Sequence, residues 1–164
     1  MLDVLIIIIV LAVFFDIANG WHDCANAIAT VVSTKVLTPG VAVAIAAFMN
    51  ILGAFLSTAV AKTIGKGIVD PAAVTNNVII AALLSAIIWN LITILMGLPV
   101  SSSHALVGGL IGAGAAHGGL SILNIDGIVK IFLSLLISPL VGFIFGFLFM
   151  KLILKLFGSL APGT

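Results

Sequence analysis

The sequence predicts an all-α integral membrane protein, and three observations lead to this prediction. Of the 164 residues, 63% are hydrophobic and 7% are charged, and the mean hydropathy is +1.46. Three intervals contain no acidic residue, lysine or arginine, namely 36–61, 71–125 and 131–150. Each interval is long enough for at least one bilayer span of about 20 residues. Because soluble domains rarely have such a composition, we expect one membrane domain over residues 1–164, surrounded by lipid.

The charged residues exclude one class of function and say little about orientation. All six basic residues are lysines and the net charge is +1, so there is no basic patch for nucleic acid. The chain begins Met1-Leu2-Asp3 without a basic region or a small-residue cleavage site, and we expect this segment to remain as an anchor. Lysines lie at the ends of several segments, so the positive-inside rule predicts no orientation.

The first apolar segment covers residues 2–34. A straight helix of that length would measure roughly 50 Å, which is too long for one upright span, so we expect a break near Asn19-Gly20. In a helix, residues spaced by three or four share a face. The polar residues that share a face in this way are Asp16, Asn19, Asp23, Asn26, Thr30 and Thr34.

This polar face predicts a cation site. Carboxylate, amide and hydroxyl oxygens are the ligands that a dehydrated hard cation prefers. Hydrogen bonding between helices would explain an amide or a hydroxyl, but not the two carboxylates of Asp16 and Asp23. A metal site built from His22, Asp23 and Cys24 would need a broken helix, because successive helical residues point about 100° apart. Gly20 leaves that alternative open.

Two further long helices are expected. Residues 39–64 form a second span that begins at Pro39, a favourable first-turn residue, and carries Asn50 as a polar residue. The last span runs from about 128 to 157 and is expected to kink at Pro139.

Between these spans, residues 71–125 predict a helical hairpin. Gly97 and Pro99 should end the first helix near Met96, and the serines that follow can cap a second helix that begins near His104. The second helix, about 105–116, is too short to cross the bilayer. We therefore expect a re-entrant hairpin whose serine-rich tip lies inside the protein.

The hairpin tip predicts an anion site. The hydroxyls of Ser101, Ser102 and Ser103 and the free amides at the start of the second helix form a cradle that the helix dipole reinforces. A single cap would account for one serine but not for three. His104 could bind the anion, titrate or orient the loop. Since the chain has no arginine, an oxyanion would be held by hydroxyls, amides and bound cations.

A cation site and an anion site in one membrane protein are typical of a transporter. Two other functions remain open from the residues alone. A membrane assembly subunit without a substrate would tolerate substitution of Asp16 and Asp23. An intramembrane serine hydrolase could use a Ser-His pair, although no third member or oxyanion hole can be assigned. We expect a transporter rather than an enzyme.

Three segments resemble the PiT family of inorganic phosphate transporters: NGWHDCANAIAT at 19–30, AKTIGKGIV at 61–69 and GLPVSSSHALVGG at 97–109. The resemblance implies one of two inverted-topology repeats, similar to the N-terminal half of the family pattern. It also implies alternating access in the plasma (inner) membrane, with phosphate and a coupling cation bound near the midplane. Cys24 stands where the family commonly has alanine or valine, and Ser103 stands where threonine is common. Both changes are small and keep the chemistry.

The resemblance also assigns roles to the polar residues. The coupling ion is Na+ or H+, and no other cofactor is expected. A cation between Asp23 and phosphate would offset their repulsion and so couple the two ligands. The phosphate ligands would be Ser101, Ser102, Ser103 and His104, the cation ligands Asp23, Asn26, Asn19 and Thr30, and the supporting residues Asp16 and Asn50.

A site between two repeats cannot be completed by one repeat. We expect either a covalent C-terminal half or a second copy in antiparallel orientation. Residues 158–164 read as a linker that has been cut short, which favours the covalent half, whereas the balanced lysines would permit dual insertion.

Overall fold

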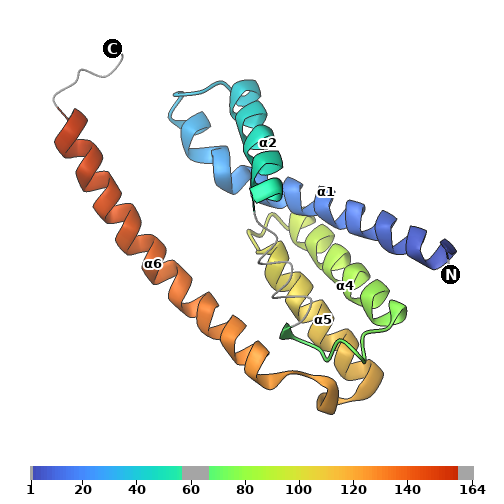
Figure 1. Cartoon of the computed structure of the whole chain (residues 1–164). Coiled ribbons are helices and arrows are strands. Elements are labelled where there is room, and N and C mark those ends of the chain that lie inside the picture. Colours follow the sequence, from blue (N-terminus) through green and yellow to red (C-terminus); the bar gives the residue numbers. More distant parts are fainter. Residues whose placement is uncertain (1, 57–66, 159–164) are drawn as a thin grey trace. The chain divides into compact units, whose positions relative to one another are not determined.

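The computed structural model describes residues 2–56 and 67–158, which are largely helical (Figure 1). Within these residues, four helices are long and apolar enough to cross a membrane, which confirms the all-helical membrane architecture. The elements in chain order are α1 (Leu2–Ser33), α2 (Pro39–Leu56), α4 (Asn76–Leu95), α5 (Ser102–Gly118), the 3-10 helix η1 (Leu120–Ile122) and α6 (Ile125–Phe157).

The chain forms two units, residues 1–124 and 125–164. The core of the first unit lies where α4 packs against both α1 and α5. Phe15 of α1 is buried there against Leu83, Ala86 and Ile87 of α4, and Leu106 of α5 packs against the same cluster. Because α4 is covered on two sides, it is the most buried of the four candidate spans. Van der Waals packing of the apolar side chains along this line stabilises the arrangement of the three helices.

The first helix is not broken, contrary to expectation. α1 continues through Asn19 and Gly20 as one helix of 32 residues. A glycine inside a helix costs about 1 kcal/mol relative to alanine. Opening the helix in an apolar environment would expose backbone groups at several kcal/mol each, so continuity is favoured. A helix longer than the bilayer core can tilt instead of breaking.

The turn of the hairpin agrees with the sequence prediction, but its second helix is longer than the expected 105–116, since α5 covers 17 residues (Ser102–Gly118). α4 ends at Leu95 with Met96 as its C-cap, and Gly97 takes a left-handed conformation at φ +66° to turn the chain. α5 begins at Ser102, two residues before the expected position, with Ser101 as its N-cap. The helices approach closely, since a Cβ added at Gly109 would lie 2.7 Å from the main-chain oxygen of Ala82. The re-entrant placement of this hairpin in the bilayer stays a prediction.

A short antiparallel contact between the segments 68–70 and 122–124 closes the hairpin at the end opposite its tip. Val69 and Leu123 form an isolated β-bridge, and Asp70 N donates to Ile122 O at 2.9 Å. Ile68 and Val69 are almost completely buried. This contact was not expected from the sequence, because it joins residues more than fifty positions apart.

The second unit contains α6, which continues through Pro139 as one helix and is drawn with a gentle curve in Figure 1. Some predictions fall outside the described residues. These are the end of the second span after Leu56, residues 61–66 of the second motif, and residues 159–164 of the proposed linker.

Candidate functional site

A pocket between α1 and α2 collects several residues of the predicted cation site. Its volume is about 560 Å³. Asp16, Asn19 and Asp23 are spaced by three and four residues, so consecutive turns of α1 present them on one face. The lining consists of Asp16, Asn19, Gly20, Asp23, Cys24, Ala27, Ala46 and Asn50.

The pocket is chemically suited to a cation. None of the described residues that line it is basic, although two of them are carboxylates. Asn50 Nδ2 donates to Ala46 O at 3.1 Å, so the amide oxygen is the group that Asn50 can offer to a cation. Asn19 Oδ1 is buried and has no hydrogen-bond partner within the described part of the chain. Asp16 and Asp23 are exposed in the described structure, and at membrane depth two carboxylates would need compensation by a cation or by protons.

Two of the predicted cation ligands lie elsewhere. Asn26 and Thr30 are exposed and do not line the pocket of Asp16 and Asp23. Thr34, in the turn after α1, donates its hydroxyl hydrogen to Thr30 O at 2.7 Å, so this hydroxyl caps the end of α1. The described structure therefore brings together the first half of the polar face and not its second half.

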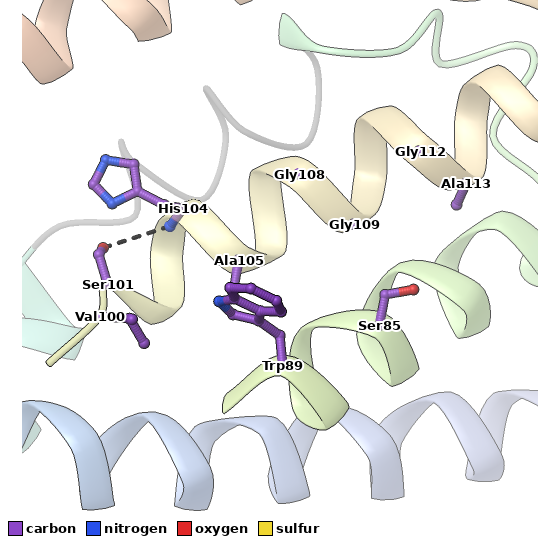
Figure 2. Close-up of a pocket in the computed structure, with 10 residues that line it drawn as sticks. All are labelled: Ser85, Trp89, Val100, Ser101, His104, Ala105, Gly108, Gly109, Gly112 and Ala113. Carbon is purple, nitrogen blue, oxygen red and sulfur yellow. Dashed lines mark hydrogen bonds between the residues drawn. The ribbon is translucent and has the colours of Figure 1, made fainter. Parts of the chain in front are cut away.

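An open groove of about 650 Å³ runs along the hairpin (Figure 2). Ser101 and His104 lie at its tip end, and Figure 2 shows the imidazole of His104 projecting away from α4. The full lining is Ser85, Trp89, Val100, Ser101, His104, Ala105, Gly108, Gly109, Gly112 and Ala113.

The three tip serines point in different directions. Ser101 lines the groove, and its Oγ accepts a long hydrogen bond of 3.5 Å from the backbone amide of His104. This bond does not use the imidazole, so it is not the serine–histidine contact that a hydrolase would need. Ser102 is completely buried, and its Oγ has no partner among the residues described. Ser103 is exposed and lies outside the groove.

His22, which was not predicted as a site residue, connects α1 to α4. Its Nε2 lies 2.9 Å from Asn90 O and 3.2 Å from Thr93 Oγ1. Because the carbonyl can only accept, Nε2 carries the proton and donates to it. On a continuous helix His22 faces α4, whereas Asp23 and Cys24 line the α1–α2 pocket, so these three neighbours do not converge on one ion.

Asn90 was also missed by the sequence analysis. It is completely buried, and both polar atoms of its side chain lack a partner within the described residues. The available signal was that Asn90 and Thr93 are polar residues one turn apart in the C-terminal half of α4, where the other residues are apolar. Polar residues in such spans usually mark functional positions.

Comparison with known proteins identifies the family of this chain. The family model described as the phosphate transporter family matches residues 19–161. A Bacillus subtilis (strain 168) protein named "Probable low-affinity inorganic phosphate transporter" is 54% identical over 136 residues, or 82% of this chain and 41% of that protein. A Rhizobium meliloti (strain 1021) protein with the same name is 51% identical over 133 residues, or 80% of this chain and 40% of that protein.

A solved structure, "The sodium-dependent phosphate transporter", is similar to this chain with a TM-score of 0.86 and 35% identity. The similarity covers 93% of this chain and 40% of that structure. The chain thus spans about two fifths of the length of these relatives. The family match and the identities confirm the resemblance found in the sequence motifs, and the chain belongs to the phosphate transporter family.

Proposed function

We propose that this chain takes part in cation-coupled transport of inorganic phosphate across a membrane by alternating access. The observation that supports it most strongly is the α1–α2 pocket, where Asp16 and Asp23 face one cavity without a basic residue among its described lining. A helix that carries two such carboxylates through an apolar bundle is typical of an ion pathway. The names of the relatives supply phosphate as the transported anion.

The coupling cation is bound in the α1–α2 pocket in this proposal. Asp23 and Asp16 provide the charge, and Asn19 and Asn50 provide amide oxygens. Oxygen ligands of this kind suit Na+, and a proton could replace it on a carboxylate. The solved relative is named as sodium-dependent, which favours Na+. Asn26 and Thr30 join the cation shell only if α1 turns or α2 shifts.

Phosphate binds at the hairpin tip in this proposal. Ser101 and His104 line the open groove, and the amides of the first turn of α5 have no acceptors within their own helix. The unpaired Ser102 hydroxyl supports this assignment, because a buried polar atom without a partner usually has a ligand or a water in the working protein. Without arginine, the anion depends on these neutral donors and on the bound cation.

The transport path is completed by further helices. A second inverted repeat, supplied by a covalent C-terminal half or by a second copy in antiparallel orientation, would face these sites. This arrangement fits the two-fifths share of each relative that the chain covers.

Uptake of labelled phosphate into proteoliposomes tests the proposal, with an inward Na+ gradient, a pH gradient or neither. Asp23→Asn keeps the shape of the pocket and removes a charge, so cation-driven uptake should nearly vanish. Asp126→Asn, in the first turn of α6, is the matched control and should retain uptake. Unchanged uptake and unchanged cation dependence in Asp23→Asn would contradict the assignment.

A further inference from the structure

We propose that His22 is a positioning residue that couples the cation pocket on α1 to the hairpin tip. The inference rests on the proposed transport function and concerns how its two ligand sites communicate. It is carried by the hydrogen bonds that connect α1 with α4 and α4 with the loop before α5.

The first step joins the cation pocket to α4. Asp23 lines the α1–α2 pocket, and His22 precedes it on the same helix. Since α1 is continuous there, any rotation or shift that moves the Asp23 carboxylate also moves the His22 imidazole. The imidazole donates to Asn90 O at 2.9 Å and lies 3.2 Å from Thr93 Oγ1.

The second step joins α4 to the hairpin tip. Thr93 is almost completely buried, and its main-chain oxygen accepts from Leu98 N at 2.9 Å. Leu98 follows Gly97, the left-handed turn residue, and the loop then reaches Ser101. Thr93 therefore contacts the α1 histidine with its side chain and the tip loop with its backbone.

The contact is suited to communication more than to stability. Thr93 Oγ1 also lies 2.9 Å from Trp89 O, a bond that it keeps when the imidazole is removed. Asn90 O is a helix carbonyl with a second lone pair, and it loses only this extra donor. Replacement of His22 should therefore leave α4 folded while it releases α1 from the hairpin.

The test measures the coupling factor, defined as the half-saturating phosphate concentration at low Na+ divided by that at saturating Na+. Coupling between two sites usually amounts to about 5- to 150-fold. His22→Leu should reduce the factor at least fivefold or to nearly 1, with the maximal uptake rate at saturating ligands retained. His22→Gln, which places an amide donor near the Nε2 position, should restore most of the coupling. His117→Leu, an exposed histidine in the last turn of α5, is the control.

Thr93→Val tests the same contact from the other helix. Valine has nearly the volume of threonine but no hydroxyl, so this variant should also lose the coupling. The double variant of His22→Leu and Thr93→Val should be no worse than either single variant, because both remove one contact. The inference would be overturned if His22→Leu and Thr93→Val both kept the wild-type coupling factor, or if His117→Leu lost as much coupling. Either result would leave the proposed function standing. Absence of Na+-dependent uptake by the wild-type protein would instead overturn the proposed function, and the inference with it.

Discussion

Replacing Ser102 by alanine should have opposite effects on stability and on phosphate binding. The Ser102 hydroxyl is completely buried, and within the described residues its Oγ lacks a hydrogen-bond partner. Burial of an unsatisfied polar group costs about 1 to 3 kcal/mol. Ser102→Ala removes that cost and keeps the Cβ, and alanine also favours the helix. Without ligand, the variant should therefore be at least as stable as the wild type. The increase in its free energy of unfolding should be at most about 3 kcal/mol.

Phosphate reverses the sign of this effect. A hydrogen bond to a charged group contributes about 1.5 to 3 kcal/mol. If the Ser102 hydroxyl donates to phosphate, its loss should raise the half-saturating phosphate concentration about 10- to 150-fold. One substitution would then raise the stability of the ligand-free protein and lower the affinity for the ligand.

Thermal unfolding in detergent without phosphate and the phosphate dependence of uptake measure the two effects. Ser134→Ala on α6 is the matched control, because the Ser134 hydroxyl already donates to Lys130 O at 2.7 Å. Both quantities should change little in that variant. An affinity within twofold of the wild type would show that Ser102 does not bind phosphate. A ligand-free protein that is destabilised by more than about 1 kcal/mol would show that the hydroxyl has another partner.

Two further predictions follow from the glycine and cysteine positions. Gly109→Ala should destabilise the hairpin by about 1 to 3 kcal/mol, because the added Cβ would lie 2.7 Å from Ala82 O. Gly112→Ala is the control, because a Cβ at this position has open space among the described atoms. It should be neutral or stabilising in the same thermal unfolding assay. Equal melting temperatures of these two variants would contradict the close approach. Cys24, the only cysteine of the chain, lines the α1–α2 pocket, so under the proposed cation assignment Na+ should slow its reaction with a methanethiosulfonate reagent relative to choline. An unchanged labelling rate would place the cation elsewhere.

Local patterns in the sequence predicted most of the helices and several residues that line the α1–α2 pocket. The spacing of Asp16, Asn19 and Asp23 is sufficient to place them on one face of a helix, whatever the helix packs against. The C-terminal end of α4 follows from Gly97 and Pro99, which act on the backbone directly. Such features depend on neighbouring residues, so a single sequence contains them.

The remaining features depend on tertiary contacts that no local pattern encodes. The bond between His22 and Asn90 joins positions 68 residues apart. The three tip serines diverge because α5 begins at Ser102 instead of near His104, which turns the hydroxyls around the first helical turn. The expected break at Gly20 was wrong because length alone does not break a helix that can tilt.

The continuity of α1 at Gly20 matters for the proposed mechanism. With a break at this position, Asp16 and Asn19 could move independently of His22 and Asp23. In the continuous helix, the pocket residues of α1 and the histidine that contacts α4 belong to one helical segment. In the proposed mechanism, cation binding that moves Asp16 and Asp23 toward α2 also moves His22 relative to Thr93. Through the bond from Leu98 to Thr93, this movement reaches the hairpin tip. Glycine in a helix makes bending there easy, so Gly20→Ala should stiffen the segment and preserve or increase the coupling factor. A lower coupling factor in that variant would indicate that transport requires α1 to bend at Gly20.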